Sequence, residues 1–259
     1  MILWALYLLI SVNPETFAVT KIDKGDGTVK IIAINHNYCE YSVEVNAEYK
    51  NMQPDVALPA VRIARARDTT VLVTLTRVQR ASWSYKYRYK YVLGNVLEAK
   101  HDERAIYRLP YDTSKSYQLF QGYNGQFSHR DKKALDFTME VGTLVHAARA
   151  GKVIRLKEDS NQGCGDESCK EMGNYILILH KDGTIAKYFH LKKNGVKVGL
   201  GDQIEAGDII GLSGNTGWST GPHLHFEVYE PSMDGEKTIP TYFITKEADK
   251  VLLTEGRKY

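Results

Sequence analysis

The run Tyr85–Tyr91 alternates tyrosine with lysine or arginine at every position, and this period of two strongly constrains the fold. Successive side chains of a β-strand point to opposite faces, so the run places four rings on one face and three cations on the other. Similar alternating runs, separated by turn residues, precede it at residues 29–35, 41–49 and 70–76. Nothing in residues 19–100 has helical periodicity, and the evenly spaced strands predict an immunoglobulin-like β-sandwich domain.

The chain is weakly basic, and the excess lies in its first half. The net charge is +3, and residues 20–100 hold more Lys and Arg than Asp and Glu. A solvated strand face is the favoured explanation, and binding of an anionic polymer of the cell envelope is the alternative. A net charge this small does not predict nucleic acid as a partner.

The first 18 residues are typical of a secretory signal. An apolar core at residues 2–10 is followed by polar residues and by a small residue, Ala18, at the expected cut. No Lys or Arg precedes the core, and a buried N-terminal strand is the alternative. No later segment could cross a bilayer, so we expect an exported protein, periplasmic or extracellular, with no transmembrane span in the mature chain.

The three cysteines fit an oxidising compartment. Cys164 and Cys169 flank a polar loop, and they are expected to form a small disulfide. The alternative is half of a zinc site, but no further cysteine pair would complete it. Cys39 lies in a strand-like run, where a buried thiol is expected.

The second half of the chain is also typical of short strands. Residues 174–183 and 184–190 predict a β-hairpin around an Asp-Gly turn. A glycine-paced series of short strands covers residues 198–214, and a further strand follows the glycine-rich loop 213–221.

Two histidines, His223 and His225, lie in that last strand. Side chains at i and i+2 share a face, so both look into one site. Imidazole binds zinc and carries protons near neutral pH, and such a pair could hold a metal and handle its water. The alternative is two polar residues on the wet face of an antiparallel strand.

A third histidine and an aspartate stand about ninety residues earlier. His129 ends a glycine-punctuated loop, and Asp136 follows seven residues later between apolar neighbours. A carboxylate in apolar surroundings requires a cation or a hydrogen-bond donor. The sequence has no His-Glu-x-x-His, so strands rather than a helix would present any metal ligands.

Together these motifs resemble the lysostaphin-type (LytM-like) zinc metalloendopeptidases that act on peptidoglycan. The resemblance is carried, in the family's order, by His129 with Ala134-Leu-Asp136-Phe, by Tyr188-Phe-His190-Leu, by the glycine-paced run, and by Gly221-Pro-His223-Leu-His225-Phe. It covers residues 117–229. It implies that residues 101–259 form an antiparallel β-sheet catalytic domain with a C-terminal tail, so the whole chain is expected to be all-β.

The resemblance also implies the metal site. His129, Asp136 and His225 would hold one zinc ion and leave its fourth position to water, as in catalytic rather than structural zinc sites. One feature departs from the common pattern, because seven residues separate His129 from Asp136 where many members have a gap of four. The longer gap matches a variant in which the extra residues bulge out.

Three further residues receive roles from the resemblance. His190 and His223 would be the catalytic pair, one accepting a proton from water and the other steadying the oxyanion or serving the leaving amine. Tyr123, six residues before the first ligand, would contact the substrate or the oxyanion. Glu227 shares the face of His225, and it could orient that ring or form a surface salt bridge.

The remaining histidines, His36, His101, His146 and His180, are expected to be structural or solvent-exposed. The resulting prediction is an exported peptidoglycan endopeptidase. One alternative is a non-catalytic relative that binds the cell wall or activates another hydrolase. The other is a carrier module that shares the glycine-paced strands and needs no metal. The sequence leaves open whether the cross-link cleaved joins D-Ala to a diamino acid or is a glycine bridge.

Overall fold

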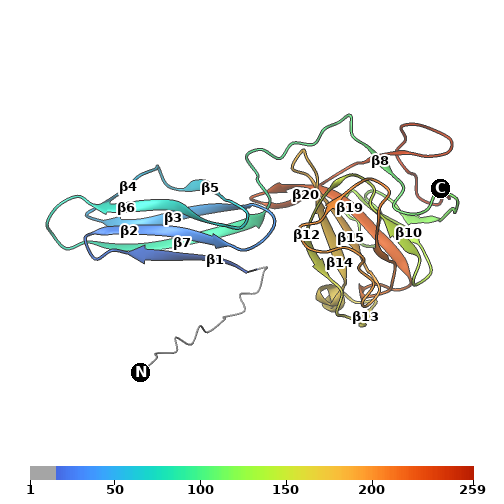
Figure 1. The fold of residues 1–259 in the computed structure, drawn as a ribbon, viewed down its shortest axis with the longest axis horizontal. Helices are drawn as coiled ribbons and strands as arrows, with labels where there is room; N and C mark the ends of the chain where they lie inside the picture. Colours follow the sequence, from blue (N-terminus) through green and yellow to red (C-terminus); the bar gives the residue numbers. More distant parts are fainter. Residues whose placement is uncertain (1–15) are drawn as a thin grey trace, which may run out of the picture. The chain divides into compact units, whose positions relative to one another are not determined.

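The computed structural model describes residues 16–259, which divide after Lys90 into two compact units. The predicted signal, residues 1–18, lies outside the described residues except for its last three. Of these, Phe17 and Ala18 begin strand β1 (Phe17–Asp23). The all-β fold is confirmed, because strands alternate with turns throughout and a short 3-10 helix, η1 (Glu167–Met172), is the one helix among residues 16–259 (Figure 1).

The N-terminal unit consists of two antiparallel sheets. One has the order β1-β2-β6-β4, with β2 at Thr28–Asn35, β6 at Asp68–Arg77 and β4 at Met52–Pro54. The other has the order β5-β3-β7, with β5 at Ala60–Ala64, β3 at Tyr41–Lys50 and β7 at Ser84–Leu93. The immunoglobulin-like assignment stays a prediction.

The alternating sequence pattern explains the core of this unit. Both sheets contribute fully buried aliphatic side chains at every second position, including Val29, Ile31, Val43 and Val45. The tyrosine-rich run forms β7, as predicted from its period of two. Cys39 is buried, as expected, and takes no part in a disulfide.

The C-terminal unit begins ten residues before the predicted boundary at Lys100. The reason is that the polar segment around residue 100 is anchored to this unit. Lys100 N donates to Asp182 O at 3.0 Å, and His101 N donates to the Glu230 carboxylate at 2.8 Å. A polar composition resembles a linker in sequence, but these backbone donors find their partners within the C-terminal unit.

An antiparallel sheet of eight strands forms the centre of the C-terminal unit. Its order is β16-β12-β14-β15-β19-β10-β9, and β20 also pairs with β19. The strands span Gln203–Ile204 (β16), Gly151–Lys157 (β12), Tyr175–Leu179 (β14), Ile185–Phe189 (β15), His223–Ser232 (β19), Ala134–Thr138 (β10), Leu119–Gln121 (β9) and Gly235–Ile239 (β20). The predicted hairpin at residues 174–190 is confirmed as β14 and β15.

Strand β19 shows how the sequence divides this sheet into two faces. Leu224, Phe226 and Val228 are buried in the hydrophobic core, and the residues between them are polar. Burial of the apolar set therefore fixes the register, because a slip of one residue would reverse both faces. His223 and His225 consequently share the opposite face.

Three two-stranded sheets surround the main sheet. They pair β11 (Leu144–His146) with β17 (Ile209–Leu212), β13 (Gly163–Cys164) with β18 (Gly217–Trp218), and β21 (Tyr242–Ile244) with β8 (Ile106–Arg108). A disulfide joins Cys164 to Cys169 across the loop that carries η1. In the described part of the chain, none of the helical segments has the length and apolarity that a membrane crossing requires.

Candidate metal centre

Three neighbouring strands, β9, β10 and β19, bring polar residues of the site into one row. In β10 and β19, Asp136 stands opposite His225, and Thr138 stands opposite His223. On the outer side of β10, Asp136 stands opposite Gln121 of β9. Directly opposed residues of antiparallel strands point to the same face with their side chains close together. Sheet pairing alone therefore gathers residues that lie up to about a hundred positions apart in sequence.

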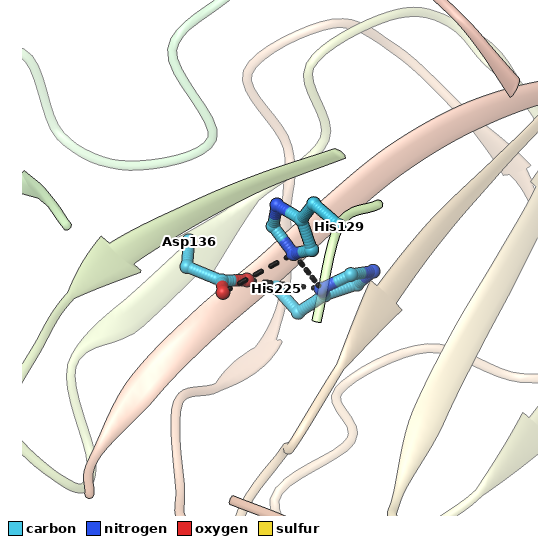
Figure 2. A group of neighbouring side chains, drawn as sticks. All are labelled: His129, Asp136 and His225. Atoms are coloured by element: carbon cyan, nitrogen blue, oxygen red, sulfur yellow. Dashed lines mark hydrogen bonds and ion pairs between the residues drawn. The ribbon is translucent and has the colours of Figure 1, made fainter. Parts of the chain in front are cut away.

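The predicted metal ligands converge at the centre of this row. His129 Nε2 lies 3.2 Å from Asp136 Oδ2 and 3.3 Å from His225 Nδ1, and His225 Nδ1 lies 2.9 Å from Asp136 Oδ1 (Figure 2). The three ligand atoms all lie within 4.8 Å of one another. A loop supplies His129, while β10 and β19 supply the other two. The gap of seven residues therefore does not separate His129 from Asp136.

Each ligand ring is oriented by a partner on its far side. His129 Nδ1 donates to Gly122 O at 3.0 Å, which turns Nε2 toward the centre. The ring of His225 has the opposite orientation to that of His129. Its Nε2 lies 3.4 Å from the Glu227 carboxylate, and its Nδ1 faces the centre. Glu227 is buried and also pairs with Lys187 at 2.8 Å. It therefore makes both of the contacts that the sequence left as alternatives.

Asp136 is held as an anion by these neighbours. Burial alone raises the pKa of its carboxyl group, but hydrogen bonds from His129 and His225 outweigh burial and hold the pKa well below its usual value. For His225, burial lowers the pKa, and the bonds to Asp136 and Glu227 reverse this and raise it to about 9. A metal ion that binds His225 Nδ1 must displace a proton, so binding is coupled to proton release.

This donor set fits a divalent ion of borderline softness. Two imidazole nitrogens and one carboxylate are the ligands of catalytic zinc sites, which keep one position open. Both rings also have the oriented outer nitrogen that metal-bound histidines need. The residues present can therefore hold one ion without rearrangement of the strands that carry Asp136 and His225.

Gln121 is a residue of this site that sequence reasoning missed. Its buried amide donates to Asp136 Oδ2 at 2.9 Å and to Ser128 Oγ at 2.8 Å. Its carbonyl oxygen accepts from the backbone of Phe127 and Ser128, both at 3.0 Å. Gln121 thus ties the ligand carboxylate to the loop that ends at His129.

We expect Gln121→Ala to weaken metal binding by about 10- to 100-fold, the usual effect of removing a residue that supports a ligand. The replacement frees Asp136 to rotate and loosens the loop before His129. Competition titration with a chromophoric chelator measures the affinity. Gln126→Ala, at an exposed glutamine of the same loop, is the matched control. Equal affinity in the two variants would contradict this role.

The other two predicted histidines stand beside the ligands as a second pair. His190 Nδ1 donates to Thr216 O at 2.7 Å, and His223 Nδ1 donates to Gly221 O at 2.7 Å. Their ring centroids are 4.4 Å apart. Both rings therefore keep an unprotonated Nε2, and both line the same pocket.

Burial keeps this pair neutral. Burial, together with the nearby His223 and His225, lowers the pKa of His190 to about 3. Burial also lowers the pKa of His223. His190 adopts a left-handed backbone conformation with φ of 63°. Non-glycine residues rarely take this conformation, and such strain is concentrated at functional sites.

Tyr123 does not join the site, which corrects the role expected for it. Its hydroxyl lies 2.7 Å from Thr241 Oγ1 and accepts from Thr241 N at 2.9 Å. Burial raises its pKa to about 12. The chain turns at Asn124, which has φ of 58°, so counting six residues back from His129 does not lead into the pocket. The exposed rings of Phe120 and Phe127 line the pocket instead.

The centre lies between two cavities that share Ser128, His190, Trp218 and His225. One, of about 250 Å³, contains Phe120, Phe127 and Pro222, and we call it the apolar arm. The other, of about 140 Å³, contains Lys132, Glu167, Lys170, Lys187 and Glu227, and we call it the charged arm. An extended chain that crosses the centre would therefore meet different chemistry on each side.

Comparisons with known proteins find similarity to peptidases in this region. Residues 130–239 match the model of peptidase family M23. Lysostaphin of Staphylococcus staphylolyticus is 37% identical over 131 residues, which are 50% of this chain and 24% of lysostaphin. The peptidoglycan DD-endopeptidase ShyA of Vibrio cholerae is 33% identical over 132 residues, 49% of this chain and 27% of ShyA.

A solved structure of the antimicrobial peptidase lysostaphin from Staphylococcus simulans is 35% identical and covers 47% of each chain, with a TM-score of 0.37. The chain spans about a quarter of the length of the two curated relatives described above. The family match at residues 130–239 lies within the C-terminal unit, which also contains the three candidate metal ligands.

Proposed function

The C-terminal unit contains a peptidase family M23 domain, and from this premise we propose that the protein is a zinc-dependent endopeptidase that hydrolyses peptide cross-links of bacterial peptidoglycan. The observation that carries the proposal is the convergence of His129, Asp136 and His225, with each ring already oriented by an outer partner. The alternative of a carrier module that needs no metal does not account for this arrangement.

His129 Nε2, Asp136 and His225 Nδ1 would hold the ion. A bound zinc ion polarises a substrate carbonyl and lowers the pKa of water to about 7. The donor types and their number favour zinc over magnesium or calcium, which prefer oxygen ligands.

His190 and His223 handle the protons of the reaction. Each presents an unprotonated Nε2 to the pocket, because a backbone carbonyl binds its Nδ1 proton. One accepts a proton from the attacking water as the oxygen bonds to the scissile carbon. The other stabilises charge on the carbonyl oxygen or supplies a proton to the departing amine. The products are a free carboxylate and a free amine.

We also propose that the protein works outside the cytoplasm, in the periplasm or the extracellular space. The disulfide between Cys164 and Cys169 supports this, because such bonds persist in oxidising compartments. The peptidoglycan substrate is located there as well. The N-terminal unit would position the catalytic unit on the wall or control access to its cleft.

Digestion of purified peptidoglycan sacculi tests the function. We expect the purified protein to convert cross-linked muropeptides into monomers, as measured by mass spectrometry. A strong chelator should stop the conversion, and one equivalent of zinc should restore it. Bound zinc without any loss of cross-links would instead favour a non-catalytic, wall-binding role.

A further inference from the structure

Strand β7 in the N-terminal unit has an aromatic face that the proposed function does not use. The cations of the alternating run lie on its other face, where Arg88 pairs with Glu48 at 3.4 Å and Lys90 pairs with Glu44 at 3.6 Å. These ion pairs account for the basic side of the strand without an anionic ligand. The aromatic side chains are half-buried or exposed, so they are not simply part of the core.

We call the side chains of Trp83, Tyr85, Tyr87 and Tyr89 the aromatic row. The rings of Trp83 and Tyr85 have centroids 6.0 Å apart and planes inclined by 12°. The rings of Tyr87 and Tyr89 have centroids 6.4 Å apart and planes inclined by 24°. Residues two positions apart in a strand repeat at about 7 Å. The row therefore presents pairs of nearly parallel rings at a regular spacing.

An open cleft of about 450 Å³ lies along the first part of this row. Three rings of the row line it, and the other lining side chains are all polar or charged. The rings are Trp83, Tyr85 and Tyr87, and the others are Lys21, Asp23, Ser84 and Lys86. In the described part of the chain, no aliphatic side chain joins this lining. Such a surface suits a ligand that has both apolar C–H groups and hydroxyl groups.

Two edge strands, one from each sheet of the N-terminal unit, frame the cleft. Strand β1 is at the end of one sheet, and β7 is at the end of the other (Figure 1). Lys21 Nζ of β1 donates to the Tyr85 hydroxyl of β7 at 2.7 Å and joins the two strands. The Asn51 amide donates to Gln79 O at 2.9 Å and fixes the turn that precedes β7. The cleft is therefore formed before any ligand binds.

We infer that this cleft binds a chain of pyranose sugars, the glycan strand of the cell wall. A pyranose ring has a face of C–H groups that packs on an aromatic ring, and its hydroxyl groups bond to ionic side chains at the rim. Tyrosine and tryptophan provide such contacts with little loss of conformational entropy. Regularly spaced rings match successive sugars of a chain. The choice of the wall glycan rests on the proposed function, whereas the affinity for pyranose does not.

Titration calorimetry with a hexasaccharide of N-acetylglucosamine, an amino sugar chain without peptides, tests this inference. The protein, freed of metal by a chelator, should bind it saturably with a Kd below about 1 mM, as a few stacked rings provide. Absence of saturable binding would overturn the inference.

The double variant W83A/Y87A should weaken this binding about tenfold or more, because two stacking rings are lost. Tyr38→Ala is the matched control, since this half-buried ring of the same unit packs against Arg67 and lies outside the cleft. Asp23→Asn, which alters no ring, should weaken binding about twofold or more by loss of a charged acceptor. Thermal melts show whether each variant is folded. If W83A/Y87A unfolds, Asp23→Asn decides, and wild-type affinity in the deciding variant would overturn the inference.

Glycan strands stripped of peptides by an amidase distinguish a sugar ligand from a peptide ligand. Co-sedimentation of the metal-free protein with these strands should persist, and W83A/Y87A should lose it. Binding to intact sacculi that disappears with the peptides would show that a peptide is the ligand, and the inference would be wrong.

Failure of the proposed function would be seen separately. If the protein binds the hexasaccharide but its metal-loaded form leaves every cross-link intact, the hydrolase assignment is wrong and the sugar site stands. If it cleaves cross-links without binding the hexasaccharide, hydrolysis stands and the sugar site is wrong. W83A/Y87A should cleave a small soluble cross-linked peptide at the wild-type rate, because the aromatic row is no part of the metal centre.

Discussion

Replacement of His225 by alanine is expected to remove the metal and to reduce turnover by at least about a thousandfold, as loss of the group that activates water implies. The variant loses one of three ligand atoms. It also breaks a buried chain of charges, in which His225 lies between Asp136 at 2.9 Å and Glu227 at 3.4 Å. Two carboxylates would then face each other across the space that the ring had filled.

Metal content per polypeptide, measured by plasma mass spectrometry after dialysis, checks this expectation. The wild type should retain about one ion, and His225→Ala should retain only a trace. His36→Ala, in the N-terminal unit, controls for the purification. An alanine variant at position 225 that keeps a full equivalent would show that the ion binds elsewhere, and the assignment of the centre would be wrong.

The second large effect is expected at His223, where alanine should preserve the metal and reduce turnover by about a hundredfold or more, as for loss of a general acid or base. His223 Nδ1 is bound to Gly221 O, and its Nε2 lies 3.8 Å from Asp136 Oδ1, farther than either ligand nitrogen. Its ring lines the pocket without belonging to the ligand triangle. Removal of the ring should therefore affect proton transfer and leave the coordinating atoms in place.

Comparison of His225→Ala with His223→Ala tests whether His225 is a metal ligand and His223 a proton-transfer residue. Metal analysis and muropeptide digestion would be run on both proteins side by side, with kcat and KM determined separately. A loss of metal in His223→Ala equal to that in His225→Ala would refute the division, and His223 would then have to be counted as a ligand. A thermal melt of each variant shows whether the sheet remains folded.

Much of this architecture could be predicted from the sequence because its signals are local. A period of two in β7 or in β19 depends only on neighbouring residues, and the apolar set of β19 decides which face is buried. The ligand set is implied by the resemblance of the motifs to the lysostaphin-type family, and the structure brings its three members together.

The residues that were missed depend on contacts that no local pattern encodes. Gln121 reaches Asp136 only because β9 pairs with β10 in one particular register. Tyr123 was misassigned because a spacing rule takes no account of the turn at Asn124. The boundary at residue 100 was misplaced because a polar segment that anchors to Asp182 has the same composition as a linker.

The left-handed backbone at His190 also limits which residues can replace this histidine. With φ at 63°, valine, isoleucine and threonine are disfavoured on steric grounds, whatever their side chains could offer the pocket. Asparagine, aspartate and glycine adopt this conformation at lower cost, but none has an imidazole. Any lineage that loses this histidine therefore has few substitutes that keep the loop intact, and inactive descendants should concentrate in that small set.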